Sequence, residues 1–320
     1  MIFDITFPSC YKLSMEKKTL RSDIMLILTS AIWGFAFVAQ LKGMEYIGPY
    51  LYNGIRFAIG SISLLPLIYF LNRKKPVETK NHLLDRKGVF LAGLLSGTVL
   101  FLGASLQQVG LQYTTAGKAG FITGLYVILV PILGILLKHR TGLPTWVGAF
   151  FAAIGLYLIS VKGGFQIGKG DLLILACSLF FAIHVLTIDH FSKKIEPVKL
   201  ASIQFAWCSL FSLIVAIVKE PILLNSIIDA TVPILYGGLG SVGTAYTLQV
   251  IAQKDAPPAH SAIIMSLESV FAVIGGIIFL SEGMTARGIV GCSLMLIGML
   301  ASQWDVIFKD SRKKFKKLQI

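Results

Sequence analysis

Residues 88–110 read GVFLAGLLSGTVLFLGASLQQVG, a stretch without a single charged side chain. As an α-helix this stretch would be about 35 Å long, which is enough to cross the roughly 30 Å hydrocarbon layer of a membrane. Comparable runs recur along the chain, which has 320 residues, 55% of them hydrophobic and only 14% charged. Because a soluble domain carries about 25% charged residues, a pair of soluble domains is excluded. The sequence predicts an all-α polytopic membrane protein.

Apolar runs and the loop signals between them predict ten transmembrane helices. We place them near 22–41, 50–72, 88–110, 116–137, 143–161, 171–189, 199–218, 231–252, 259–280 and 285–304. With the N-terminus inside, the inner segments hold 22 of the 29 Lys and Arg residues, and the outer loops hold 5. The positive-inside rule therefore predicts that both termini are cytoplasmic.

The net charge of +13 comes mainly from cations that cluster at 12–21, 73–87 and 309–317, each beside an apolar run. This placement favours contact with anionic membrane lipids over nucleic-acid binding. The four cysteines show no C-x-x-C spacing, so we expect neither a disulfide framework nor a metal site, and no cofactor. They are Cys10, Cys177, Cys208 and Cys292.

The chain matches itself at two offsets, which indicates an internal repeat. At an offset of 148, Asp23 meets Asp171, Ser30 meets Ser178, and Ile55-Arg56-Phe57-Ala58 meets Ile203-Gln204-Phe205-Ala206. At an offset of 143, Ala119 meets Ala262, Gly148 meets Gly291, and Gly155 meets Gly298. Each half holds five spans, and this odd number inverts the second half across the membrane. Inverted repeats are typical of secondary transporters, in which the two halves expose a central site to each side in turn.

The repeat also predicts the domain boundaries. A cytoplasmic tail (1–21) precedes the first five-helix repeat (22–161), and a linker (162–170) leads to the second repeat (171–304) and a basic tail (305–320). A secretory signal peptide is the competing interpretation of the segment 1–41. Because the first span belongs to the repeat, we expect it to be retained. The segment 1–14 is expected to be dispensable, since Met15 offers an alternative start.

Three stretches carry a resemblance to a known family. Residues 110–131, GLQYTTAGKAGFITGLYVILVP, resemble the fourth-span signature of EamA-type transporters of the drug/metabolite transporter superfamily. Residues 266–272, SLESVFA, followed by FLSE at 279–282, are similar to the ninth-span signature, and Arg56-Phe57 matches a third element. The resemblance implies ten helices in two inverted halves and the efflux of small metabolites or amino acids across a bacterial inner membrane. Ser269 departs from the family pattern, which usually has Pro after the Glu, and this leaves the kink of the ninth span open.

Three charged residues lie well inside predicted spans, where a charge costs at least about 2.5 kcal/mol. Arg56 is expected to form a structural ion pair, to reach the interface, or to contact substrate. Lys118 is expected to anchor at the headgroups or to act as a gate beside the pathway. Glu268, the residue nearest mid-membrane, is expected to carry a proton or to form a structural hydrogen bond. Asp171 and Glu282 are expected to be interfacial.

Uncharged side chains complete the candidate site. Together with Lys118, the residues predicted to contact substrate are Trp33, Gln107, Gln108, Tyr126, His184, Tyr246 and Gln249, and Gln40 is a further polar residue within a span. The alternative for each is ordinary packing or a helix-to-helix hydrogen bond. Glycine faces such as Gly93-x-x-x-Gly97, Gly120-x-x-x-Gly124 and the run Gly237, Gly238, Gly240, Gly243 are expected to pack helices closely.

The leading functional prediction is a secondary exporter of small organic solutes. No Walker-type nucleotide motif occurs, and the five histidines are scattered without an H-E-x-x-H pattern. A membrane-embedded enzyme would need a cluster of such groups, so it remains the weaker alternative, together with a non-transporting assembly factor. A homodimer is left open by the sequence, as are the substrate, the direction of transport and the coupling ion.

Overall fold

The computed structural model describes residues 8–73, 85–137, 142–160, 168–281, 283 and 285–302, and within these ranges the chain is helical without a strand. The basic cluster at 309–317, most of the 73–87 cluster, Glu282 and most of the predicted linker lie outside the described residues. Each of the ten predicted ranges contains at least one described helix.

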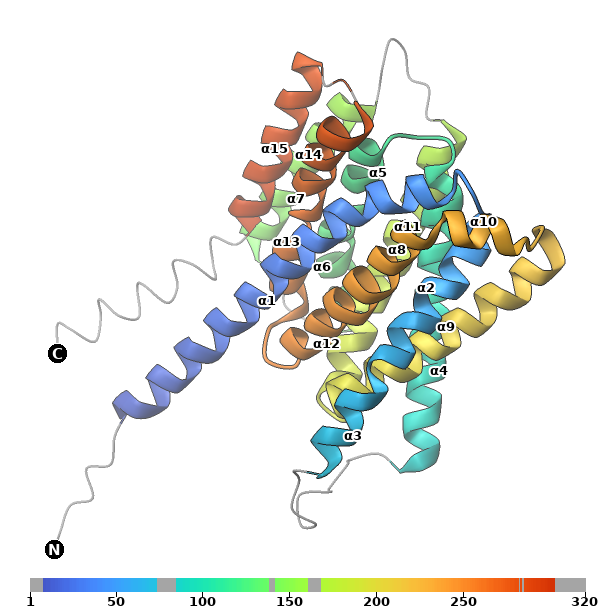
Figure 1. Ribbon diagram of the computed structural model, residues 1–320. Helices are drawn as coiled ribbons and strands as arrows, with labels where there is room; N and C mark the ends of the chain where they lie inside the picture. The colour runs from blue at the N-terminus through green and yellow to red at the C-terminus, as the bar shows by residue number, and fades with distance from the viewer. Residues whose placement is uncertain are drawn as a thin grey trace, which may run out of the picture.

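In the first half the helices are α1 (Pro8–Gly43), α2 (Pro49–Ser63), α3 (Leu65–Arg73), α4 (Arg86–Leu111), α5 (Ala116–Thr123), α6 (Tyr126–Leu136) and α7 (Leu143–Ser160). In the second half they are α8 (Lys169–Ser192), α9 (Pro197–Lys219), α10 (Leu224–Asp229), α11 (Thr231–Leu235), the π-helix η2 (Tyr236–Tyr246), α12 (Thr247–Gln253), α13 (Pro258–Met265), α14 (Glu268–Leu280) and α15 (Ala286–Ser302). Figure 1 shows them as one helical bundle, which α1 crosses.

Within the described part of the chain, seven helical segments are long and apolar enough to cross a membrane, by length and composition. They are Leu20–Gly43, Pro49–Arg73, Arg86–Leu111, Ala116–Leu136, Lys169–Ser192, Pro197–Lys219 and Pro258–Leu280. The remaining predicted ranges hold α7, the series α11–η2–α12, and α15. The protein is therefore a multi-pass membrane protein, and the count of ten spans stays a prediction.

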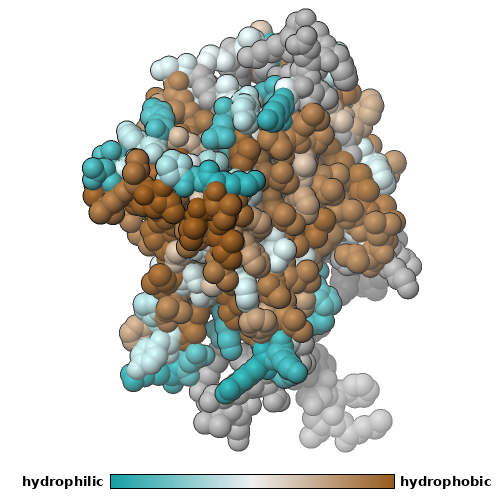
Figure 2. All heavy atoms as spheres, turned by 90° about the vertical axis from the view of Figure 1, so that its right-hand side faces the viewer, coloured by the Kyte–Doolittle hydropathy of each residue, from teal (hydrophilic) through white to brown (hydrophobic). Residues whose placement is uncertain are grey.

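The outer surface agrees with a lipid environment. Large apolar side chains are exposed on many helices, among them Leu136, Ile217, Val218 and Val232. In Figure 2 a band of apolar residues separates hydrophilic regions toward the top and the bottom of the molecule. Such a band would be an aggregation hazard in water, whereas hydrocarbon solvates it.

The predicted span 231–252 is not a single α-helix, which corrects that expectation. It consists of α11, the π-helix η2 and α12. Glycine-rich sequence has low α-helical propensity, and η2 holds Gly237, Gly238, Gly240 and Gly243. The hydroxyl of Thr244 donates to the carbonyl of Leu239, five positions earlier, at 2.9 Å. A π-helix places one extra residue in the turn and is often found at functional sites.

The predicted spans 116–137 and 259–280 are each broken at their middle. Between α5 and α6 the amide of Leu125 donates to Ile122, and that of Val127 donates to Gly124, so each of these bonds reaches back three positions instead of four. Between α13 and α14 the amide of Leu267 donates to Ile264 in the same way. The second break forms although Ser269 stands where the family pattern usually has proline. The ninth span is therefore interrupted without that proline.

The positions of the two breaks change the second repeat offset from 143 to 142 for the helices around them. An offset of 142 relates both ends of α5 to both ends of α13, and the end of α4 to the end of α12. The offset of 143 holds for the starts of α7 and α15, and 148 holds for the starts of α2 and α9. Small apolar residues match at many registers, whereas a break in the hydrogen-bond ladder has one position.

Glycine faces bring the helices together, as expected. A Cβ on Gly97 would lie 2.8 Å from the carbonyl oxygen of Gln204, and one on Gly120 would lie 2.7 Å from the Cβ of Ala272. A further close approach involves Gly34 of α1, whose added Cβ would lie 2.7 Å from the carbonyl oxygen of Glu268. These contacts fix α1 and α5 against α14 at the level of its break.

Candidate functional site

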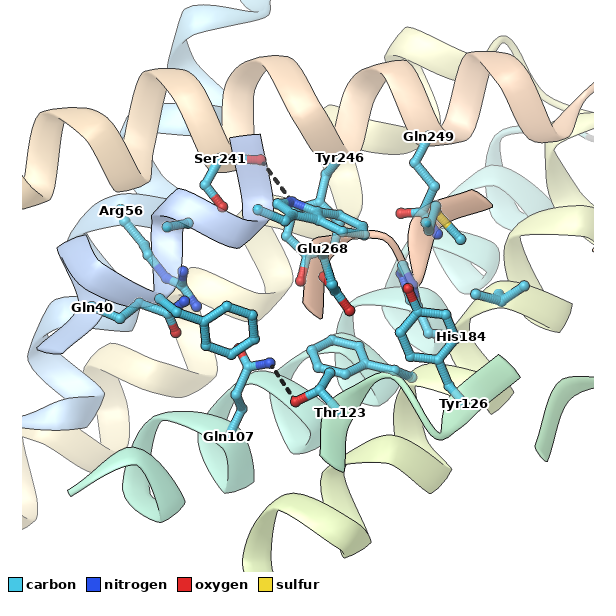
Figure 3. A pocket seen from close by; sticks show the side chains of 16 residues that line it. Gln40, Arg56, Gln107, Thr123, Tyr126, His184, Ser241, Tyr246, Gln249 and Glu268 are labelled. Carbon is cyan, nitrogen blue, oxygen red and sulfur yellow. Dashed lines mark hydrogen bonds between the residues drawn. The ribbon is translucent and has the colours of Figure 1, made fainter. Parts of the chain in front are cut away.

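A small cavity lies at the centre of the bundle, between helices of both halves. About 30 Å³ of it is open to the centre of a water molecule, which is room for roughly two or three waters. The side chains that line it are shown in Figure 3: Trp33, Ala36, Phe37, Gln40, Arg56, Gln107, Thr123, Tyr126, Phe181, His184, Val185, Ser241, Tyr246, Gln249, Met265 and Glu268. A metabolite is larger than this space, so loading requires the bundle to open.

Most of the lining consists of repeat-equivalent residues. At the offset of 148 the pairs are Trp33 with Phe181, Ala36 with His184, and Phe37 with Val185. At the offset of 142 the pairs are Gln107 with Gln249, Thr123 with Met265, and Tyr126 with Glu268. The cavity is therefore made from the same positions of the two halves, while most of the side chains at those positions differ.

Aromatic rings form one wall of the cavity. The rings of Trp33 and Tyr246 are 4.5 Å apart, and the indole nitrogen donates to the carbonyl of Ser241 at 3.4 Å. Tyr246 also contacts Phe57 and Phe205, each at 6.0 Å between ring centres. Tyr246 ends η2, so the π-helix positions the residue that joins these rings.

Arg56 is only 2% exposed, so it does not reach the interface as one of our expectations had it. Its Nε donates to Asn53 at 2.9 Å, and its guanidinium lies 5.0 Å from the ring centre of Phe57 and 5.5 Å from that of Tyr52. No ion pair of Arg56 occurs among the described residues, which corrects the expected carboxylate partner. Aromatic faces and one amide therefore hold this cation at the cavity.

Glu268 is 3% exposed and is the first residue of α14, directly after the break. Among the described residues its Oε1 has no hydrogen-bond partner within standard geometry, and neither has the hydroxyl of Tyr126, the first residue of α6. The two side chains are close enough to interact electrostatically. Figure 3 shows both side chains pointing into the cavity from opposite breaks. Unpartnered buried polar atoms are rare in proteins, and these two lie where a ligand or a proton could be bound.

The remaining polar side chains are partly engaged. The Nε2 of His184 lies 2.9 Å from the Oε1 of Gln204, and the amide of Gln107 donates to Thr123 at 3.2 Å. The Oε1 atoms of Gln40 and Gln249 are buried without partners among the described residues. These two oxygens add hydrogen-bonding capacity that a bound molecule can use.

Two of the predicted site residues lie away from the cavity lining. Gln108 is buried and donates to the backbone carbonyl of Gln40 at 3.4 Å. Lys118 forms an ion pair with Asp171 at 2.6 Å. Asp171 was expected to lie at the membrane interface. It is buried within the protein, and the ion pair compensates its charge. The other eight predicted residues, Trp33, Arg56, Gln107, Tyr126, His184, Tyr246, Gln249 and Glu268, all line the cavity.

Sequence reasoning missed Thr123 and Ser241 among the polar lining residues. Thr123 could have been found from its position three places before Tyr126, on the same helical face. Ser241 contributes to the bonding through its backbone carbonyl on the π-helix, and no sequence signal predicts that geometry.

Comparisons with known proteins agree with this architecture. The family model described as "EamA-like transporter family" matches residues 20–161 and 168–302. An uncharacterized transporter of Archaeoglobus fulgidus is 32% identical over 286 residues, which covers 88% of this chain and 86% of the relative. The uncharacterized transporter YetK of Bacillus subtilis is 27% identical, and the match covers 90% of this chain and 88% of the relative.

A solved structure titled "Crystal structure of protein" has the same fold. Its TM-score is 0.66, and the match covers 90% of this chain and 96% of that one, at 17% sequence identity. The starts of the two segments matched by the family model, 20 and 168, are related by the offset of 148 found for α2 and α9.

Proposed function

The chain belongs to the EamA-like transporter family, and from this premise we propose that it is a secondary exporter of small metabolites, such as amino acids or related organic solutes. The observation that carries the proposal is the central cavity lined by equivalent positions of both halves. A site on a repeat interface can be opened to one side or the other when the halves exchange conformations. Transporters of this kind are in general not enzymes.

The proposed arrangement has ten spans in two inverted five-helix repeats, with both termini in the cytoplasm and the protein in the cell (inner) membrane. Support comes from the 22 to 5 bias of Lys and Arg and from the helices found in every predicted range. Anionic lipids are the expected neighbours of the basic segments. A homodimer is compatible with the exposed apolar surface.

The cavity lining suggests how a small organic solute would be held. Trp33 and Tyr246 offer ring faces to apolar or aromatic groups. Arg56 is a buried cation without a carboxylate partner among the described residues, so it can bind an anionic group. The amides of Gln107 and Gln249 can donate to and accept from polar atoms of the bound molecule.

We assign the coupling proton to Glu268. The Glu268 carboxyl group lies in the central cavity and has an oxygen without a partner among the described residues, so it is placed to bind a proton. When the cavity opens to the cytoplasm or to the outside, water solvates the carboxylate and the proton leaves. An exporter driven in this way exchanges one solute for protons that enter the cell.

Flux measurement in proteoliposomes tests the proposal. The purified protein is screened with radiolabelled amino acids and organic cations, with a pH gradient imposed across the membrane. We expect Glu268→Gln to keep the fold and substrate exchange, because Gln has the shape of the neutral acid, and to lose at least about 100-fold of gradient-driven flux, typical of removing an essential proton carrier.

The matched control is Tyr126→Phe, at the equivalent position of the other half. It removes one hydroxyl and should retain gradient-driven flux within about tenfold. A Glu268→Gln protein that still concentrates substrate by means of the pH gradient would refute the proton-carrier role. Absence of flux for every compound in the wild-type protein would count against transport of this solute class.

A further inference from the structure

Two ion pairs outside the cavity occupy equivalent positions of the two repeats. In the first, the Nζ of Lys118 lies 2.6 Å from the Oδ2 of Asp171, and the pair joins α5 to α8. In the second, the Nε2 of His260 lies 2.6 Å from the Oδ1 of Asp23, and the pair joins α13 to α1. An offset of 142 relates Lys118 to His260, and an offset of 148 relates Asp23 to Asp171, as for the helices that carry them.

The two pairs lie at opposite ends of the bundle. Gly110 at the end of α4 packs on the backbone of Gly170, beside Asp171. Two positions before Gly110, the Gln108 side chain reaches the carbonyl of Gln40, late in α1. From Asp23 to Gln40 the helix rises by about 26 Å. Helix α1 thus runs from one ion pair to the level of the other.

The pair at Asp171 is closely held. Asp171 also accepts from the backbone amide of Gly168 at 3.0 Å and from the hydroxyl of Thr114 at 3.5 Å. Three groups therefore hold the Asp171 carboxylate at this end of the bundle. Neither lysine nor aspartate is a type of side chain that ordinarily changes charge between about pH 5 and 8.

The pair at His260 has the same geometry with a different cation. The His260 side chain is 8% exposed and Asp23 is 28% exposed, so water reaches the carboxylate but not the ring. The Nδ1 of His260 is buried and has no partner among the residues that the structure describes. Of the side chains that change charge between about pH 5 and 8, His is the common one.

The charged groups that flank this pair on its own helices and connection are exposed. They are Arg21 on α1, and Lys254 and Asp255 between α12 and α13. Water surrounds these groups and screens their effect on the His260 ring.

The charged groups of the other helices packed on α13 are already engaged. On α8, Asp189 is paired with Lys193 at 2.7 Å, and His190 contacts Lys194 at 2.7 Å. Helices α6 and α12 carry no Asp, Glu, Lys or Arg. The guanidinium of Arg287, on α15, lies over the ring of Tyr157.

We infer that these two ion pairs are the gates at the two ends of the transport pathway, and that only the His260–Asp23 gate is closed more tightly by protons. The inference rests on the proposed alternating access. With the N-terminus in the cytoplasm, the His260–Asp23 gate faces the cytoplasm and the Lys118–Asp171 gate faces outside. A fall in cytoplasmic pH then favours the state that is closed to the cytoplasm.

The direction follows from the contact. A neutral imidazole can already donate one hydrogen bond to the Asp23 carboxylate, and protonation of the ring adds the attraction between two opposite charges at this 2.6 Å contact. The new N–H at the unpartnered Nδ1 offsets part of this gain. Because the open gate separates the two side chains, the attraction between the charged ring and the carboxylate exists only in the closed gate, and acid therefore favours closure.

Distances between spin labels test the inference without a known substrate. The full-length chain, with its four cysteines replaced, is labelled at Leu20 and Lys254 across the His260–Asp23 gate. A second sample is labelled at Lys169 and Gln112 across the Lys118–Asp171 gate. All four labelled positions are exposed. Both samples are measured in lipid nanodiscs between pH 5.5 and 8.

We expect the open population at the His260–Asp23 gate to fall at least threefold between pH 8 and 5.5. His260→Lys should make it independent of pH and mostly closed, as at the other gate. Lys118→His should give the Lys118–Asp171 gate a new pH dependence of the same sign. Each variant places a cation that the equivalent position already accepts, so both should fold.

Three results would overturn the inference. The wild-type populations could be independent of pH, the His260–Asp23 gate could open in acid, or His260→Lys could keep the full pH response, which would assign that response to another group such as Glu268. Because these measurements need no transport, proton-driven flux in a protein with a pH-independent gate would leave the proposed function intact. A protein that shows the expected gate response but transports no solute would count against the proposed function and leave the gate inference intact.

Discussion

The two breaks at the centre of the bundle have the same backbone and different chemistry. The amides of 124, 125, 127, 128 and 129 bond to the same relative acceptors as those of 266, 267, 269, 270 and 271. The residue that follows the break is Tyr126 in one half and Glu268 in the other. Equal backbones allow the halves to exchange conformations, whereas unequal side chains allow the cycle to have a direction.

The same contrast appears at other equivalent positions of the two halves. Arg56 of α2 corresponds to Gln204 of α9, which is neutral and bonds His184 instead. Gly34 of α1 corresponds to Ala182 of α8, so close approach to a break is required in the first half and relaxed in the second. Substitutions at such pairs measure how much the side chain of each half contributes to stability or transport.

The largest effect is expected at Gly34. In Gly34→Ala the new Cβ would lie 2.7 Å from the carbonyl oxygen of Glu268 and 2.8 Å from the amide nitrogen of Ala272, and backbone atoms cannot move aside cheaply. We expect a loss of about 3 kcal/mol in the free energy of unfolding, measured by titration with SDS in mixed micelles. The control is Gly240→Ala, whose Cβ would meet only Ile32 at 3.8 Å. Equal stability of the two variants would contradict the close approach of α1 and α14.

A smaller effect is expected from Arg56→Ala compared with Gln204→Ala. Arg56 loses two ring contacts and a hydrogen bond to Asn53, about 2 kcal/mol in total. Gln204 loses one hydrogen bond to His184, about 1 kcal/mol. The amounts of folded protein in the membrane and the unfolding free energies of both variants check the difference. If Arg56→Ala were as stable as wild type but had no flux, Arg56 would act on substrate alone.

The smallest effect is expected at Ser269, which follows Glu268 where the family pattern usually has proline. Its hydroxyl donates to the carbonyl of Gly120 at 2.8 Å and joins the second break to α5. Ser269→Ala should cost about 1 kcal/mol of unfolding free energy. Ser293→Ala, on an exposed face of α15, is the control and should change stability by less than about 0.5 kcal/mol. A cost no greater than that of the control would show that the break does not depend on this bond.

Much of this site could be predicted from the sequence because a polar side chain in an apolar run has few uses. Trp33, Arg56 and Glu268 are conspicuous on that ground, and all three line the cavity. The repeat is visible for the same reason, since Asp23 and Asp171 stand out in apolar surroundings. Their ion-pair partners, Lys118 and His260, could not be identified, because each contact joins helices that are far apart in the chain.

The helix breaks and the π-helix could not be predicted. Each depends on a change of hydrogen-bond partner by one position, and the residues involved, such as Gly124 and Ser266, are also common in unbroken membrane helices. An ion pair was one alternative for Arg56, but among the described residues aromatic rings and Asn53 hold this buried cation instead. Composition reveals that a charge is buried, whereas the packing decides what stabilises it.

The size of the central cavity has a consequence for the electrical behaviour of the membrane. A space for roughly two or three waters cannot support a file of water molecules across about 30 Å of hydrocarbon. The central cavity by itself therefore offers no continuous water path for ions across the membrane. Leakage of ions through it would require the same opening of the bundle that a solute needs.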